Sequence, residues 1–242
     1  MIGRWLLIVL TLIVVGGCAT SPPYDPYRVP KSQVHSQVKT IALSPVSLPR
    51  VARQAEGVKG RIESLITTKL EKAGYIVVPS KEFGAIWDRL AEQIGGFFDP
   101  VTGKANEERI KTVREHARRE MVTRFKVDAL LHPRVQVVWA PFKTDEAVWD
   151  GVSETVMADD SFHAFGPGTA QALSLAILIE GGNGVDFYAS RGGIQLISKA
   201  VRGRFVDVKA SEILTNDEKI IKAVDIALNQ FLKNTKTPGK SS

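Results

Sequence analysis

Between residues 38 and 78 the hydrophobic positions follow first the two-residue period of a strand, then the period of a helix, then a strand again. Residues 38–43 (VKTIAL) alternate in side-chain type, and Pro45 ends the run. A helical stripe follows, Gly74 marks its end, and residues 75–78 form a second short apolar run. This order predicts a βαβ unit whose two strands are parallel neighbours. The stripe consists of Val58, Ile62, Leu65, Ile66, Leu70 and Ala73.

Two more helices are predicted before residue 126. The first spans residues 80–94, with Ser80 as its expected cap and Gly95 and Gly96 as its end. The second spans residues 106–125 and is strongly charged, with only a narrow apolar stripe. The apolar face of the first is formed by Phe83, Ile86, Trp87, Leu90 and Ile94, and that of the second by Ile110, Val113, Ala117, Met121 and Phe125.

From Asp128 onward the period is two, which predicts strands joined in antiparallel hairpins. In the third of these strands Leu173, Leu175, Ile177 and Ile179 share one side, so helices are expected to cover that face. The strands are predicted at residues 129–140, 147–157, 169–179 and 185–198, with turns at 141–145, 159–168 and 181–184.

A last helix is predicted after a capping box formed by Thr215 and Glu218. Its core face is expected to hold Val224, Ala227, Leu228 and Phe231, together with Ile220 or Ile221. The element order predicts a mixed α/β (α+β) fold. A mixed sheet would contain the N-terminal βαβ unit and antiparallel hairpins, with helices packed against it. Residues 38–233 are expected to form one globular domain, and the polar residues 234–242 a flexible tail.

The first 17 residues have the layout of an export signal. Arg4 precedes an apolar run at residues 5–15, which is followed by Gly16, Gly17 and Cys18. As a helix the run would span about 16 Å, whereas the apolar core of a bilayer is about 30 Å thick. It is therefore predicted to be a signal peptide and not a permanent membrane anchor.

Residues 15–18 (VGGC) resemble the lipobox of bacterial lipoproteins. The resemblance implies cleavage between Gly17 and Cys18 and acylation of Cys18, with palmitate or a similar chain. Multiple acyl chains hold a protein firmly to a membrane. Ala19 follows where an aspartate would imply retention at the inner membrane of a Gram-negative bacterium, so the resemblance implies an outer-membrane lipoprotein facing the periplasm. Four prolines in residues 19–37 predict that residues 18–37 form an extended tether, reaching up to roughly 60 Å.

The folded part resembles the fold shared by the amino-terminal domain of TolB, the curli-secretion lipoprotein and the lipoprotein activators of penicillin-binding proteins. The similar segments are VKTIALSPV at 38–46, LEKAGYIVVPS at 70–80, KVDALLHPRV at 126–135 and ALSLAILIEGGNGVDFYAS at 172–190. Members of that group mostly bind or assemble envelope components. The resemblance therefore implies a protein that is not an enzyme, although it transfers no site residue.

The amino-acid composition limits the kinds of metal site and active site that the protein can contain. The chain has 242 residues, 44% of them hydrophobic, and its single cysteine excludes an intramolecular disulfide or a multi-thiolate zinc site. Asp159, Asp160 and His163 form the one local cluster of carboxylates and imidazole, and a solvated turn is the expected role of that cluster. No cofactor, no metal and no catalytic residue is predicted.

Positive charge is concentrated in the predicted helix 106–125. The chain carries +6, and residues 104–126 contain eight basic and four acidic residues, a net of +4. One interpretation is a solvated face with i,i+4 ion pairs. The other is that Arg114, Arg118 and Arg119 bind an anionic envelope component or an acidic protein. Nucleic acid is not an expected partner outside the cytoplasm.

Three functional hypotheses follow. The first is a lipoprotein, anchored to the membrane through Cys18, that binds or scaffolds an envelope partner without catalysis. The second is a subunit of an export channel of the curli-secretion type, for which residues 169–179 have the necessary length. The third is an envelope hydrolase that uses the Asp159, Asp160 and His163 cluster. The sequence predicts no oligomeric state.

Overall fold

A mixed sheet of seven strands forms the centre of the protein. The computed structural model describes residues 24–99, 102–158 and 166–233. Strands β2 (Ile76–Val78), β1 (Thr40–Leu43) and β3 (Ala129–Phe142) run parallel in that order. Strand β6 (Gly168–Gly181) pairs antiparallel with β3 and with β7 (Asp186–Leu196). Helices pack against the sheet, so the predicted fold class is confirmed.

The predicted βαβ unit is present at the start of the sheet. Strand β1 (Thr40–Leu43), helix α2 (Val58–Lys72) and strand β2 (Ile76–Val78) follow one another, and β1 pairs parallel with β2. The 3-10 helix η1 (Arg50–Ala55) lies in the connection before α2. Gly74 follows α2 with a φ of +90°, a conformation that glycine adopts without strain.

Helices pack on one face of the sheet. Strands β3 (Ala129–Phe142) and β6 (Gly168–Gly181) have 14 residues each and pair along their whole length, and β7 (Asp186–Leu196) pairs with β6. Helices α2 and α5 (Asp217–Leu232) pack on this face. The face expected for β6 is confirmed, because its four alternating apolar residues join the buried cluster beneath those helices: Leu173, Leu175, Ile177 and Ile179.

The opposite face is covered only at its two ends. Helices α3 (Ser80–Gln93) and α4 (Glu107–Phe125) rise from one end, where Phe83 and Met121 pack against Ala42 and Leu130. Strands β4 (Glu146–Trp149) and β5 (Val152–Thr155) cover the other end. The apolar cluster at that end contains Ala140, Phe142, Ala147, Trp149, Val156, Ala170, Ala172 and Leu196.

The strand predictions after residue 142 need correction. Residues 147–157 form a hairpin and not a single strand, because Asp150 and Gly151 both have positive φ and turn the chain between β4 and β5. A second, two-stranded sheet of β8 (Ser198–Val201) and β9 (Arg204–Asp207) was not predicted. The 3-10 helix η2 (Ala210–Glu212) then leads to α5.

Two predicted helix caps are also wrong. Ser80 is the first residue of α3, and its hydroxyl donates a hydrogen bond to Glu63 on α2 instead of capping the helix. Asn216 caps α5 by accepting a hydrogen bond from the backbone N–H of Lys219, whereas the hydroxyl of Thr215 donates to the carbonyl of Glu212. In both cases a neighbouring residue has the backbone geometry of the cap.

The tether predicted over residues 18–37 is wrong for its second half. The carbonyl of Pro26 accepts a hydrogen bond from Ala189 on β7, and the N–H of Arg28 donates one to the carbonyl of Phe187. Helix α1 (Lys31–Gln37) follows, and its Val34 is fully buried in the main core. The folded unit therefore begins no later than Tyr24, whereas the predicted signal, Cys18, the 159–163 cluster and the tail lie outside the described residues.

Candidate functional site

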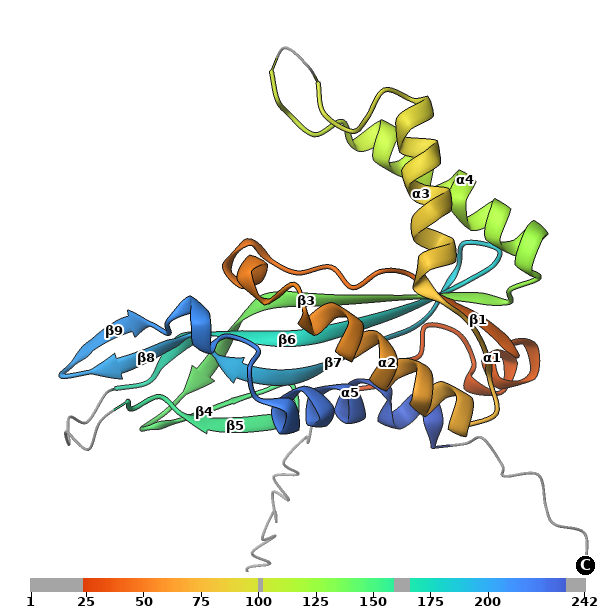
Figure 1. Ribbon diagram of the computed structural model, residues 1–242. Coiled ribbons are helices and arrows are strands. Elements are labelled where there is room, and N and C mark those ends of the chain that lie inside the picture. The colour runs from red at the N-terminus through yellow and green to blue at the C-terminus, as the bar shows by residue number, and fades with distance from the viewer. Residues whose placement is uncertain (1–23, 100–101, 159–165, 234–242) are drawn as a thin grey trace, which may run out of the picture.

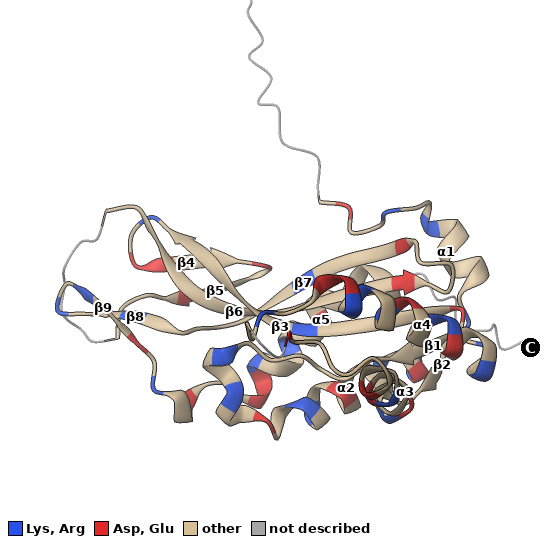
Figure 2. Cartoon of the chain, turned by 90° about the horizontal axis from the view of Figure 1, so that it is seen from above, with Lys and Arg blue, Asp and Glu red and all other residues tan. Residues whose placement is uncertain are grey.

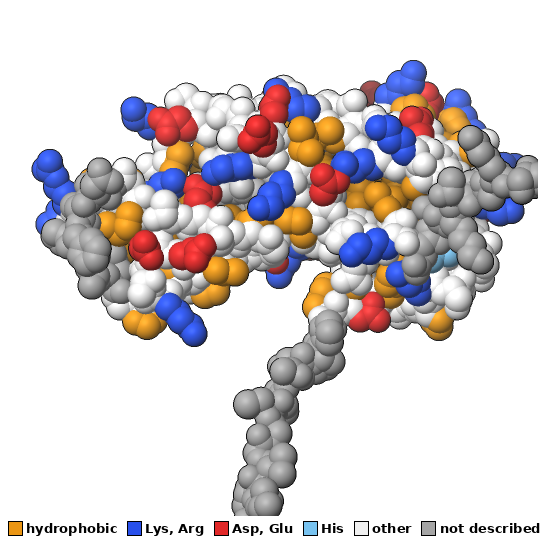
Figure 3. Space-filling view, turned by 90° about the horizontal axis from the view of Figure 1, so that it is seen from below, with side chains coloured by type: hydrophobic (Ala, Val, Ile, Leu, Met, Phe, Trp, Pro, Cys, Tyr) orange, Lys and Arg blue, Asp and Glu red, His pale blue; other side chains and the backbone are white. Residues whose placement is uncertain are grey.

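Between its two covered ends, the open face of the sheet forms a trough. The cavity has a volume of about 1730 Å³, and Figure 3 shows the surface hollowed beside the start of the described chain. Its floor lies on three strands, where the register places Ala176 of β6 between Arg134 of β3 and Arg191 of β7. The adjacent row contains Leu178 and Ala189. Small and apolar residues thus form a floor between two arginines.

The walls of the trough come from segments far apart in the sequence. Helix α3 supplies Phe83 and Trp87, whose rings stack with centroids 6.0 Å apart. Residues 44–47 form a segment that runs beside β3, and the N–H of Ser47 donates a hydrogen bond to the carbonyl of Pro133 at 3.1 Å. On the opposite side stand the N-terminal segment and α5, which contribute Tyr24, Arg28, Ile226, Asn229 and Gln230.

A chain of polar side chains closes the end of the trough near α4. The hydroxyl of Ser44 lies 3.1 Å from Nδ1 of His132, and Nε2 of His132 lies 3.4 Å from Oε2 of Glu180. Among the described residues Nε2 has no hydrogen-bond partner, so the second contact is electrostatic. Arg118 on α4 completes the chain, with its Nε 3.2 Å from Oε1 of Glu180.

The charges around Glu180 keep its carboxylate ionised. His132 beside it lowers the pKa of Glu180 most, burial opposes this shift, and Arg118 and Arg114 lower the pKa further. The net direction is downward from the usual value of a glutamic acid. Glu180 therefore remains a fixed negative charge beneath His132.

Serine, histidine and glutamate in a row resemble a nucleophile with its base, but the surroundings of Ser44 do not favour acyl transfer. Such chemistry needs N–H donors directed at the developing oxyanion. The N–H of Ser44 donates to Leu131, that of Val46 to Glu63 and that of Ser47 to Pro133, and Pro45 has none. The backbone beside Ser44 therefore offers no free donor pair, and the three side chains instead connect β1, β3 and β6.

The end of the trough near β4 and β5 is fixed by Asp150. Its carboxylate accepts a hydrogen bond from the hydroxyl of Ser174 at 2.7 Å and lies 3.2 Å from Nε of Arg191. Two other arginines of the lining, Arg28 and Arg134, have no ion pair and no side-chain hydrogen bond within the described ranges. Their guanidinium groups are exposed and available to a ligand.

The three arginines predicted to bind a partner do not share one surface. Arg114 is exposed and lines the trough. Arg118 is only 14% exposed, pairs with Glu180 and donates to the carbonyl of Gly182 at 2.7 Å. Arg119 is exposed but does not line the cavity. Arg118 precedes the buried residue Met121 by three positions, a spacing that places both on one side of the helix and could have indicated its inward position.

Most trough residues were missed at the sequence level. His132, Arg134 and Gln136 occupy alternating positions of an otherwise apolar strand, which indicates a polar face. Whether that face meets solvent or a helix depends on how α3 and the β4–β5 hairpin pack, and the pattern of β3 alone does not contain this information.

Comparison of the chain with models of known protein families finds no match, and comparison with curated proteins finds none. In the described parts of the chain no helix is long and apolar enough to cross a membrane. No cluster of three or more potential metal ligands occurs among the same residues.

Proposed function

We propose that the protein is an exported lipoprotein, anchored through an acylated Cys18, whose trough binds an envelope partner without catalysing a reaction. The observation that carries this proposal is the trough itself. Its floor and its end groups are held by hydrogen bonds and ion pairs, whereas Arg28 and Arg134 in its lining have no ion pair with any described residue. A preformed concave surface with a few polar groups is typical of binding sites.

The proposed location is the outer membrane, with the folded domain in the periplasm. Support comes from the lipobox-like residues 15–18 and from Ala19. Metabolic labelling with a fatty-acid analogue tests the anchor. We expect label on the wild-type chain and none on Cys18→Ala, and a labelled, processed Cys18→Ala protein would overturn it.

The binding hypothesis is favoured over the export-channel alternative by the position of residues 169–179. These residues lie in β6, whose two edges are paired with β3 and β7 and whose apolar side is buried beneath the helices. Strands β4 and β5 have only four residues each. No hairpin of the required length is therefore free to leave the domain among the residues that the structure describes.

In-cell photocrosslinking tests the proposed binding site. A photoreactive phenylalanine derivative would replace Gln136 in the trough and, as a matched control, Ile221, which is exposed on α5 and outside the trough lining. We expect a discrete crosslinked product from position 136 and none from position 221. The same product from both positions, or none from position 136, would contradict binding in the trough.

A further inference from the structure

In the structure, the folded domain begins closer to the proposed lipid anchor at Cys18 than the predicted tether of residues 18–37 would place it. Cys18 precedes Tyr24 by six residues, and an extended chain spans at most about 3.5 Å per residue. The sulfur of Cys18 therefore lies within about 20 Å of Tyr24, not at the end of the roughly 60 Å tether expected from the prolines. This step rests on the proposed acylation of Cys18.

The segment that begins at Tyr24 is firmly attached to the domain. The hydroxyl of Tyr24 donates to the carbonyl of Ala189 at 2.8 Å, and that of Tyr27 to the carbonyl of Gln230 at 3.2 Å. The ring of Tyr27 packs edge-on against Tyr188 at 5.2 Å. The point at which the N-terminal chain leaves the domain is therefore fixed, on the side of β7 and the end of α5.

The attached segment also forms one side of the trough. Tyr24 is 61% exposed, and both Tyr24 and Arg28 line the cavity together with Asn229 and Gln230 of α5. Figure 1 shows the described chain starting at the lower edge of the domain, whereas α3 and α4 extend from the upper side. A bilayer held close to Tyr24 would thus face the mouth of the trough, with α3 and α4 pointing away from it.

We infer that the trough opens onto the bilayer that carries the anchor and that it binds the phosphate of a phospholipid headgroup from that bilayer. The unpaired guanidinium groups of Arg28 and Arg134 supply the phosphate-binding donors, and an exposed tyrosine at the mouth suits the membrane interface. Asp186 of the lining also lacks an ion pair in the described chain, and its carboxylate matches the ammonium of a zwitterionic headgroup.

Lipid photocrosslinking on nanodiscs tests this orientation. The chain from Cys18 to Ser242 would be coupled through the Cys18 thiol to a maleimide lipid, which makes the test independent of acylation in the cell. A phospholipid with a photoreactive headgroup then labels the protein, and mass spectrometry maps the adducts. We expect adducts in residues 24–28, 186–191 and 226–230, and adducts confined to residues 80–125 would overturn the inference.

Matched variants separate headgroup binding from mere proximity. Replacing both arginines (Arg28→Gln with Arg134→Gln) should reduce trough adducts at least fivefold, whereas Arg119→Gln on the far side of α4 should leave them unchanged. A flexible insertion of 20 residues after Ala19 should also disperse the adducts. Equal labelling of all variants, or full competition by free glycerol phosphate at micromolar concentration, would overturn a bilayer headgroup as the occupant. Failure here with normal in-cell crosslinking would reject this inference but not the proposed function.

Discussion

At the scale of single residues, neighbouring charges on α4 have different roles because they point in different directions. Arg118 faces inward and joins Glu180, while Arg119 is exposed. Glu120 pairs across to Arg89 on α3 as well as with Arg124 on its own helix. Figure 2 shows basic and acidic residues mixed along the helices. The basic helix is therefore partly a structural element that holds the sheet and α3.

This difference predicts opposite outcomes for two adjacent substitutions. Arg118→Gln should lower the free energy of unfolding by about 2 kcal/mol, because it removes the permanently charged partner of the nearly buried Glu180. Arg119→Gln should change it by less than about 0.5 kcal/mol. Urea denaturation of both variants measures this, and equal effects would show that Arg118 is not a structural residue.

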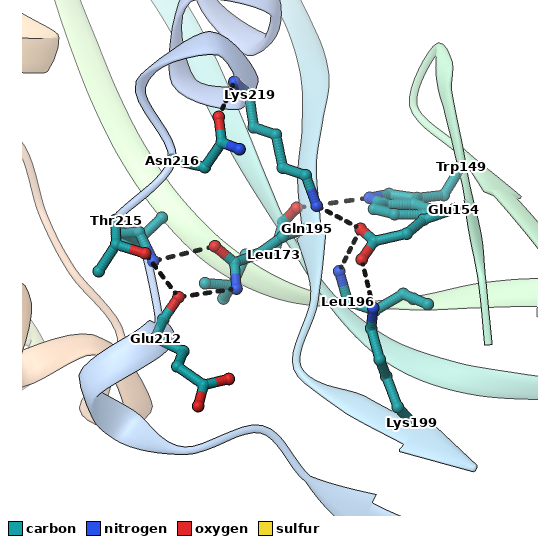
Figure 4. A network of polar contacts seen from close by, with 11 residues as sticks. Trp149, Glu154, Leu173, Gln195, Leu196, Lys199, Glu212, Thr215, Asn216 and Lys219 are labelled. Carbon is teal, nitrogen blue, oxygen red and sulfur yellow. Dashed lines mark hydrogen bonds and ion pairs between the residues drawn. The ribbon is translucent and has the colours of Figure 1, made fainter. Parts of the chain in front are cut away.

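A second residue-scale prediction concerns Glu154. Its carboxylate accepts a hydrogen bond from the N–H of Leu196 and lies 2.9 Å from Nζ of Lys199 and 3.1 Å from Nζ of Lys219, so it joins β5, β7, β8 and α5 (Figure 4). Burial raises the pKa of Glu154, but the hydrogen bonds from the two lysines and the backbone outweigh it, and the net pKa is lowered from 4.5. The folded state thus favours the ionised form.

Because the pKa of Glu154 is lower in the folded state, its ionised carboxylate stabilises the protein above pH 4.5. This contribution is lost as the pH falls through the folded-state pKa, which lies below 4.5. Glu154→Gln should therefore cost about 2 kcal/mol at pH 7 and flatten the decline of stability below pH 4.5. Urea denaturation across pH 3 to 7 compares the two proteins. An unchanged slope in the variant would mean that other carboxylates cause the decline.

At the scale of elements, the close packing of α5 on β7 depends on Gly192. A Cβ at this position would lie 2.1 Å from the backbone oxygen of Ala223 on α5. Backbone cannot move aside as a flexible side chain can, so the two elements would have to separate. The same closeness lets α5 cover the strand and bury Val224, Ala227 and Leu228.

Gly192→Ala should therefore destabilise the protein by about 3 kcal/mol or more. The control is Gly60→Ala in α2, where a Cβ meets nothing within 4 Å. That change should stabilise the protein by roughly 0.5 to 1 kcal/mol, because alanine has a higher helix propensity than glycine. Thermal unfolding of both variants distinguishes the packing effect from helix propensity, and a neutral Gly192→Ala would contradict the observed contact.

At the scale of the whole molecule, one core joins the N-terminal segment to the last helix. Val34 of α1 and Val224 of α5 belong to the same buried cluster. A ring cluster reinforces the connection, in which Phe231 of α5 packs against His35, Tyr75 and Tyr188 at centroid distances of 5.3 to 5.7 Å. Removal of the first described residues would thus expose the interior of the domain.

A chain of residues 24–233 should unfold in one cooperative step, and added chelator should not change its midpoint. A chain of residues 38–233 should be less stable by several kcal/mol, because it loses Val34 and the aromatic contacts of Tyr27 and His35. Calorimetry measures both. Equal stability would show that the N-terminal segment is a tether after all.

The sequence by itself determined the elements whose hydrophobic period is strong and local. Apolar stripes predicted α2, α4 and α5, and alternating apolar residues predicted β6. The buried face of each element was predicted too, because a row of apolar side chains must be shielded from water. The Asp150–Gly151 turn and the role of Asn216 were missed, since each depends on backbone conformation at one or two residues.

The tertiary structure alone decided where the candidate site lies. Polar residues on β3 line a trough only because α3, the β4–β5 hairpin and the N-terminal segment stop short of the middle of the sheet. The proline-rich residues before 38 read as a tether because their few apolar side chains have no period. Residues 24–37 fold because β7 and α5 offer an edge and a pocket for Tyr27 and Val34, contacts that join residues more than 150 positions apart in the sequence.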